Sequence, residues 1–343
     1  MGATARVQER FAAQALAGEP LDSPLAVAER LLAVQGQDPR GFRLAIRART
    51  EGLTAADVDR ALSEDRSLVV SWLNRGTLHL VRSEDYPWLQ ALTTPPLLTS
   101  CTRRLRQEGV PAEVGERAVA TIERALAEEG PLTRIDLKER LEAAGVPTGG
   151  QALIHLLFLA AVRGVAVRGP MAGKQHAYVP VRDWIGEAKV VDRDIALAEL
   201  ARRYLVGHAP ASDRDLARWA GLPLRDARAG LTAIASELEE LEGGLVRLAK
   251  QQRPGVAPRP RLLGAFDPVL LGWTSREEII GSHTSLVTRN GIFHPFALVE
   301  GRAVARWRFP KGEVALEPFE PIAARAAKAL ELEAADVARF LSG

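Results

Sequence analysis

The sequence repeats one order of predicted elements, in which two or three helices are followed by a short β-hairpin. In the clearest copy, apolar residues recurring every three to four positions predict helices over residues 118–128, 135–144 and 151–163. Two short apolar stretches, 165–167 and 175–179, then predict the strands of a hairpin. Three helices with a two-stranded wing are typical of the winged-helix module, which places a helix and a wing on nucleic acid or on a partner protein.

Two further copies of this order are predicted. One spans residues 40–82 and contains the strongest hairpin signal of the chain, around the turn Asn74–Gly76. The other spans residues 191–250, where Ser212 and Asp215 form a helix-capping signal. Residues 251–343 are predicted to be mostly β-strand and to end in two helices, over 322–330 and 334–341.

We therefore predict an α+β protein built of tandem winged-helix modules, each a helix-turn-helix with a β-wing, plus a C-terminal β-rich region. The predicted domains are residues 1–110, with the N-terminal helices, the first module and the candidate catalytic motif; 111–190; 191–250; and 251–343.

Composition says more about the cellular compartment of the protein than about its function. The chain has 45 Lys and Arg against 43 Asp and Glu, so any basic surface must come from local clustering. One cysteine, Cys101, excludes an intrachain disulfide and a cysteine-built zinc site, which fits a reducing cytoplasm. The sequence has no apolar run of membrane-spanning length and no signal-peptide core, and no motif typical of a metal or nucleotide site. We expect a cytoplasmic protein with no cofactor, no metal and no membrane partner.

A polar segment, Gln35-Gly36-Gln37-Asp38-Pro39, directly follows the apolar stretch 31–34. In an extended chain, side chains two residues apart project to the same side, and a carboxamide donates and accepts hydrogen bonds at once. Gln35 and Gln37 are therefore candidates to hold and orient one water molecule. The alternative is that they cap the end of the preceding helix, and the residue types alone favour this simpler role.

Basic residues supply candidate DNA contacts. Arg75, Thr77 and His79 lie at the tip of the first predicted wing, although the same segment also fits a hairpin turn that simply requires glycine. A basic helix over 100–107 is predicted after a chain break at Pro95–Pro96. For each cation, the alternative is an ordinary solvated surface charge. The remaining candidates are Arg40, Arg103, Arg104, Arg106, Lys174, Lys250, Arg253, Arg259 and Arg261.

Asp267, set among apolar residues before Pro268, is a candidate general base with a raised pKa, and a turn aspartate is the alternative that we favour.

Four ordered segments together give a family resemblance: Leu-Leu-x-x-Gln-x-Gln-Asp-Pro at 31–39, Trp-Leu-x-Arg-Gly-Thr-Leu-His-Leu-Val at 72–81, the residues 262–272 and Asn-Gly-Ile-Phe-x-Pro at 290–295. Over most of its length the chain resembles the winged-helix DNA glycosylases of the AlkZ/YcaQ kind. The resemblance implies a C-shaped scaffold of tandem winged helices around a DNA channel. It also implies a catalytic Gln-Φ-Gln motif, where Φ is apolar; the matching residues are Gln35 and Gln37, with Gly36 in place of a larger side chain.

The activity that the resemblance implies is hydrolysis of the N-glycosidic bond of N-alkylated purines, N7-alkylguanine and N3-alkyladenine, by a water held on the two amides. Alkylation makes the purine a cationic leaving group, so bond cleavage with oxocarbenium character needs no strong acid. No lysine lies near the motif, which fits a monofunctional enzyme without AP lyase activity. Similar proteins are self-resistance factors in producers of DNA-alkylating antibiotics and unhook interstrand crosslinks, which are a candidate substrate here. The implied partner is double-stranded DNA carrying alkylated or crosslinked purines, bound by a monomer in a bacterial nucleoid.

Two other classes of function remain open. A transcriptional regulator built of winged helices binds DNA but has no use for two amides aimed into a channel. A protein-interaction scaffold predicts no salt-dependent DNA binding, whereas the other two classes predict a steep dependence.

Overall fold

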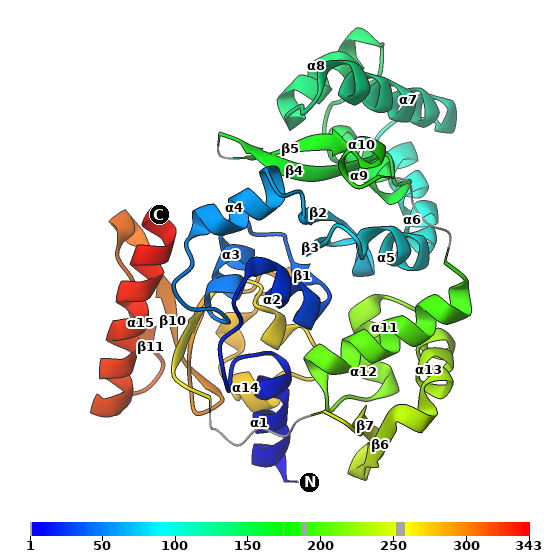
Figure 1. Ribbon diagram of the computed structural model, residues 1–343. Coiled ribbons are helices and arrows are strands. Elements are labelled where there is room, and N and C mark those ends of the chain that lie inside the picture. The colour runs from blue at the N-terminus through cyan, green and yellow to red at the C-terminus, as the bar shows by residue number, and fades with distance from the viewer. Residues whose placement is uncertain (1, 174, 187–190, 252–257) are drawn as a thin grey trace. The chain divides into compact units, whose positions relative to one another are not determined.

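The computed structural model describes residues 2–173, 175–186, 191–251 and 258–343, and it has the predicted α+β composition (Figure 1). The chain divides into two compact units. One comprises Met1–Val58 and Asp194–Gly343, and the other comprises Asp59–Arg193. Within the described ranges, the structure contains no helix that combines the length and the apolar character required to cross a membrane.

The unit of residues 59–193 is built on antiparallel strands with helices packed against them. Strand order is β3-β2-β4-β5, so the hairpins of the first and second predicted modules belong to one sheet, joined where Val70 lies opposite Arg168. Its elements are β2 (Leu68–Trp72), β3 (Leu78–Arg82), α5 (Tyr86–Thr93), α6 (Pro95–Gln107), α7 (Ala112–Glu129), α8 (Arg134–Ala143), α9 (Ala152–Val162), β4 (Ala166–Ala172), β5 (Gln175–Pro180) and α10 (Val181–Trp184).

The break predicted at Pro95–Pro96 lies one residue earlier, at Thr94 between α5 and α6, and the helix predicted over 100–107 already begins at Pro95. Proline is accepted in the first turn of a helix, where its missing N–H would have no partner and its fixed φ is already helical. The helix buries Cys101 and Leu105 and leaves its arginines exposed.

The other unit combines N-terminal helices, a three-helix segment with a hairpin, and a four-stranded antiparallel sheet of order β11-β10-β9-β8. Helix α15 packs against β8 and α3 (Figure 1). The elements are α1 (Ala3–Ala13), α2 (Pro24–Leu31), β1 (Val34–Gln35), α3 (Pro39–Arg47), the start of α4 (Ala55–Ser63), α11 (Arg193–His208), α12 (Asp213–Ala220), α13 (Leu224–Ala233), β6 (Leu238–Leu241), β7 (Leu245–Leu248), β8 (Arg261–Leu263), α14 (Glu277–Ile280), β9 (Phe296–Val299), β10 (Arg302–Arg308), β11 (Ala315–Pro318) and α15 (Ala324–Ser342).

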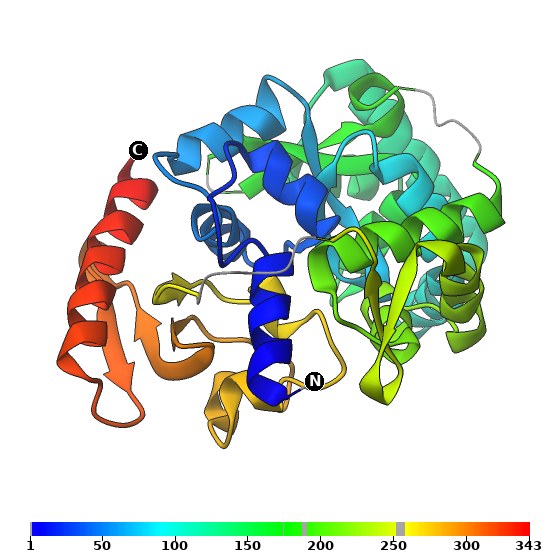
Figure 2. The same cartoon turned by 60° about the horizontal axis from the view of Figure 1, so that its bottom comes forward.

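The two helices predicted at the C-terminus are one continuous helix, α15 (Figure 2). The boundary predicted near residue 331 contains Glu, Leu and Ala, which are strong helix formers, and no glycine or proline interrupts it. The apolar residues Leu330, Val337 and Phe340 share its buried side.

The same local arrangement occurs in both units. Between α7 and α8, Leu132 forms an isolated antiparallel bridge with Tyr178 of β5; between α11 and α12, Ala211 forms one with Val246 of β7. In each case the next residue begins a capping box, formed by Thr133 with Asp136 before α8 and by Ser212 with Asp215 before α12. A helix, a bridge, two helices and a hairpin therefore recur in the order that the sequence predicts.

Candidate functional site

The segment that carries the two glutamines begins where helix α2 ends. The helix stops at Leu31, and Leu32 adopts a left-handed backbone with a φ of 62°, which turns the chain out of the helix. Strand β1 follows directly and ends at Gln35. The glutamines thus lie beyond the C-terminal cap of α2, in the extended connection to α3.

The other end of this segment is fixed by the N-terminal cap of α3. The Asp38 carboxylate accepts a hydrogen bond from the Arg40 backbone N–H at 3.0 Å, and Pro39 occupies the first helical position. Gln37 therefore stands immediately before a capped helix start.

The two amides are in direct contact. Gln35 Nε2 donates a hydrogen bond to Gln37 Oε1 at 2.8 Å. The Gln35 side chain is 5% exposed, whereas Gln37 is exposed, so the pair runs from the interior to the surface. A carboxamide oxygen has two lone pairs, and Gln37 Oε1 can accept a second hydrogen bond, from a water molecule, beside the one from Gln35.

Helix α3 is held against the residue 264–267 turn by backbone-to-backbone packing. A Cβ atom added to Gly41 would lie 2.3 Å from the Ala265 carbonyl oxygen, and one added to Gly264 would lie 2.9 Å from Leu44 Cβ. The two backbone segments can lie this close only because glycine has no Cβ atom at these two positions. The first turn of α3, directly after Gln37, therefore has no freedom to shift toward this turn.

A fully buried ion pair joins α3 to the same turn. Arg49, just beyond the end of α3, donates from Nη2 to Asp267 Oδ1 at 2.9 Å and from Nη1 to Oδ2 at 3.0 Å, and both side chains are 0% exposed. Asp267 also accepts from the Val269 backbone N–H at 3.0 Å. The interpretation as a general base is wrong, because a completely buried carboxylate held by a bidentate arginine cannot reach a substrate; Asp267 is the turn aspartate.

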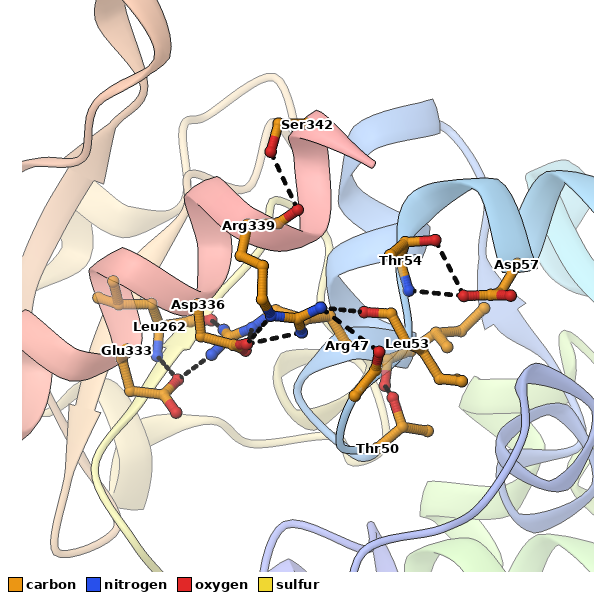
Figure 3. A network of polar contacts seen from close by, with 12 residues as sticks. Arg47, Thr50, Leu53, Thr54, Asp57, Leu262, Glu333, Asp336, Arg339 and Ser342 are labelled. Atoms are coloured by element: carbon orange, nitrogen blue, oxygen red, sulfur yellow. Dashed lines mark hydrogen bonds and ion pairs between the residues drawn. The ribbon is translucent and has the colours of Figure 1, made fainter.

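The C-terminal end of α3 is anchored to α15 through Arg47 (Figure 3). Its guanidinium donates to Glu333 at 2.6 Å, to Asp336 at 2.8 Å and to the Leu262 carbonyl at 3.1 Å. Glu333 also pairs with Arg261 at 2.7 Å. The predicted DNA contact Arg261 thus belongs to this internal network and links β8 to α15.

A cavity of about 420 Å³ lies beside the first turn of α3. Asp38 and Arg40 line one part of it, and His294, Arg306 and Phe309 line another. The Arg40 guanidinium carbon lies 5.8 Å from the centre of the Phe309 ring, a cation–π contact. Sequence reasoning missed His294, Arg306 and Phe309; only the 290–295 segment gave a signal, because it belonged to the family resemblance.

Most of the other predicted DNA-binding residues are at the surface. Arg75 and Thr77 are half-buried at the β2–β3 turn, where Arg75 has a left-handed φ of 58°. Lys174 and Arg253 lie outside the described residues. The exposed candidates are Arg40, Arg103, Arg104, Arg106, Lys250 and Arg259.

His79 does not belong with them. Its side chain is 1% exposed, and burial, together with repulsion by the Arg75 cation, lowers the pKa of His79 to about 3. The ring Nδ1 lies 2.9 Å from the Thr77 carbonyl oxygen. A buried neutral imidazole offers no cation to a phosphate, so the predicted DNA contact at this position is wrong: β3 is buried on both faces from Leu78 to Val81, and His79 lies within this stretch.

The fold is that of a DNA glycosylase. The structure matches that of Streptomyces sahachiroi DNA glycosylase AlkZ with a TM-score of 0.82 at 26% sequence identity. The match covers 99% of this chain and 96% of that chain. The family model of AlkZ-like DNA glycosylases matches residues 28–340, so the chain belongs to this family, and the resemblance seen in the four sequence segments is confirmed. The chain is also 31% identical to the interstrand DNA cross-link repair glycosylase of Streptomyces sahachiroi, over 94% of this chain and 92% of that protein.

Proposed function

We propose that this protein is a monofunctional DNA glycosylase that hydrolyses the N-glycosidic bond of N-alkylated purines, N7-alkylguanine and N3-alkyladenine, and unhooks interstrand crosslinks formed through such purines. The observation that carries the proposal is the Gln35–Gln37 contact of 2.8 Å, fixed between a helix end and a capped helix start. Crosslinks are included because a relative 31% identical to this chain is named for their repair.

In the proposed reaction, Gln37 Oε1 accepts a hydrogen bond from the attacking water, and Gln35 holds that amide in place. The water oxygen forms a bond to the anomeric carbon as the C–N bond to the purine breaks. The bonding electrons leave with the alkylated base, whose positive charge they neutralise, and the water proton passes to solvent. Because the leaving group is already cationic, orientation of the water by neutral amides suffices.

The absence of AP lyase activity is part of the proposal. Strand cleavage by a glycosylase requires an amine that forms a Schiff base with the sugar. Residues 2–137 contain no lysine, and no lysine lines the cavity beside α3. An abasic site is therefore the expected product.

We further propose that the recurring helix-and-hairpin segments are tandem winged helices that hold DNA. The bridges Leu132–Tyr178 and Ala211–Val246, each followed by a capping box, support a repeated module. The arginines of α6 and Arg40 supply exposed cations for phosphate contact.

The test is release of base from duplex DNA that carries one N7-methylguanine, by the native chain, Gln35→Ala and Gln37→Ala. We expect release by the native chain, a loss of about 100-fold or more in kcat for either variant, and unchanged DNA affinity. A crosslinked duplex run in parallel tests unhooking.

Salt-sensitive DNA binding without release of base from either substrate would indicate a DNA-binding regulator. No DNA binding at all would indicate a protein-interaction scaffold. If both Gln35→Ala and Gln37→Ala still released the base, groups other than these two amides would have to orient the attacking water.

A further inference from the structure

Two arginines on one strand share a single carboxylate at the wall of the cavity beside α3. Arg306 and Arg308 lie two positions apart on β10, so their side chains leave the strand on the same side. Arg306 Nη2 donates to Glu317 Oε2 at 3.0 Å, and Arg308 Nη2 forms an ion pair with Glu317 Oε1. Glu317 lies on β11, which pairs with β10 (Figure 1). All three residues line the cavity.

Glu317 occupies only a part of the hydrogen-bond donors of this arginine pair. Each guanidinium group carries five N–H donors, and the carboxylate contacts one nitrogen of each. The Arg306 side chain is 39% exposed and the Arg308 side chain is 74% exposed, and exposed ion pairs of this kind add little stability. The open donors can bind an anion instead, and guanidinium groups bind phosphate through two parallel hydrogen bonds.

The cavity carries an excess of positive charge. Arg40 also lines it, with its guanidinium over the Phe309 ring, and among the described residues this guanidinium has no carboxylate partner. The two carboxylates of the cavity are both engaged, since Asp38 caps α3 and Glu317 holds the two arginines. Three guanidinium cations against two carboxylates leave a charge of +1 before any charge on His294 is counted, so the cavity attracts an anion.

The cavity begins one residue away from the glutamine pair. Asp38 lines it and directly follows Gln37, whose amide oxygen holds the attacking water in the proposed reaction. The sugar that this water attacks is joined to a phosphate on each side, and a DNA strand carries one phosphate about every 3.4 Å along its axis. A DNA strand that brings its anomeric carbon to the water on Gln37 therefore brings phosphates to the same part of the protein, where the cavity supplies cations.

We propose that Arg306 and Arg308 bind one backbone phosphate of the damaged strand next to the lesion, and that this contact sets the position of the anomeric carbon relative to the water on Gln37. Glu317 holds the two guanidinium groups side by side before DNA binds. The inference rests on the proposed glycosylase function and adds to it a phosphate site that positions the substrate, separate from the two amides.

The experiment removes the arginine and the phosphate charge separately and together. The substrates are duplexes with one N7-methylguanine, in which each phosphate of the damaged strand within two nucleotides of the lesion is replaced in turn by a neutral methylphosphonate. The proteins are the native chain, Arg308→Ala, Glu317→Gln and Arg202→Ala. Arg202, on α11, is the matched control, because it also forms an exposed pair with a glutamate, Glu237, at 2.7 Å.

We expect Arg308→Ala to lower kcat/KM about tenfold on the duplex with all its phosphates, the loss typical of a hydrogen bond to a charged group. At one position the methylphosphonate should cost the native chain about tenfold, and on that duplex Arg308→Ala should lose no more than about twofold further, because the two changes remove the same contact. Arg202→Ala should match the native chain on every duplex.

Glu317→Gln separates phosphate binding from a structural role. Glutamine keeps the size of the side chain and removes the charge that competes with the phosphate, so kcat/KM should stay at the native value or rise by up to about threefold. A loss equal to that of Arg308→Ala would overturn the proposal, because the pair would then serve only to hold β10 to β11. A native rate for Arg308→Ala would also overturn it, and so would a loss that no methylphosphonate position diminishes.

A second readout requires no release of base. Each phosphate contact contributes about 0.9 to the slope of log K against log salt, so on an undamaged duplex Arg308→Ala should reduce that slope by about this amount and Arg202→Ala should leave it unchanged. If the native chain releases no base but shows this pattern, the proposed glycosylase function fails and the phosphate site stands. Release of base together with an unchanged slope for Arg308→Ala would defeat the phosphate site alone.

Discussion

At the scale of single residues, the most restrictive position is Gly41. A methyl group there would lie 2.3 Å from the Ala265 carbonyl oxygen, so α3 must move by about 1 Å to accept it. We predict that Gly41→Ala lowers the free energy of unfolding by about 2–3 kcal/mol. Because the shift would displace Gln37, we also predict a loss of about 100-fold in base release. Urea unfolding and single-turnover release check the two effects.

The matched control is Gly115→Ala in α7. Its added Cβ would lie 3.5 Å from Leu159 Cδ2, an ordinary contact, and alanine is favoured over glycine in a helix by up to about 1 kcal/mol. We expect this variant to be as stable as the native chain or more so. Comparable destabilisation in both variants would refute the close-packing argument for Gly41.

His79 gives a residue-scale prediction about pH. Its pKa is lowered to about 3 in the folded chain from an ordinary 6.5, so between these values the unfolded chain binds a proton that the folded chain does not. The stability that this site contributes is fully present above about pH 6.5 and is lost progressively as the pH falls toward 3. From pH 7 to 5, this site should cost about 2 kcal/mol. Urea unfolding of native and His79→Gln at both pH values checks it; equal pH dependence in the two would contradict it.

At this scale, sequence reasoning succeeded where the determinant was local. The two-residue spacing of Gln35 and Gln37 sufficed to predict that their amides lie together. It favoured the turn role of Asp267, which the structure has, but it could not identify the partner Arg49, which is 218 positions away in the chain. It also failed for His79, because a polar residue in a buried strand position does not reveal its burial by type.

At the scale of elements, helix existence was predictable and helix limits were not. The capping signal of Ser212 gave α12 with its observed bounds, because a cap is a local interaction. Helix α6 begins at Pro95, earlier than predicted, and α15 is one helix where two were predicted. In both cases the local sequence is compatible with the observed helix, because proline suits the first turn and no glycine or proline interrupts α15 near residue 331.

The α3–α15 connection gives the element-scale prediction. Glu333 accepts from Arg47, Arg261 and the Leu262 N–H and is 10% exposed, so Glu333→Gln leaves two guanidinium groups without their shared anion. We predict a loss of about 3 kcal/mol in the free energy of unfolding. Arg339→Ala, which breaks the exposed pair with Asp336, should cost less than about 1 kcal/mol. Equal costs in denaturant titrations would show that burial of the Glu333 pair is unimportant.

At the scale of the whole molecule, the repeat was predictable, whereas its assembly was not. Each hairpin carries its own turn signal, so three were recognised from the sequence. That β2 pairs with β4, placing two of the hairpins in one sheet, depends on edges that meet only after folding. For the same reason the cavity beside α3 could not be predicted, because its walls come from four separate parts of the chain. The lining residues are Asp38, Arg40, Leu44, Ala265, His294, Pro295, Arg306, Trp307, Arg308, Phe309 and Glu317.

A formal net charge of only +2 means that DNA affinity has to come from local groups of cations, and α6 offers the densest one. Arg103, Arg104 and Arg106 are exposed on this helix. Each phosphate contact contributes about 0.9 to the slope of log K against log salt, so replacing all three with serine should reduce that slope by about 2–3. The kcat at saturating DNA should not change, because α6 supplies no group to the chemistry.

Arg140→Ser is the control: its charge is already neutralised by Glu129, so the slope should stay constant. Fluorescence anisotropy over a salt series measures both variants. A triple variant with native slope would remove α6 from the DNA-binding surface and assign the phosphate contacts to Arg40, Lys250 and Arg259.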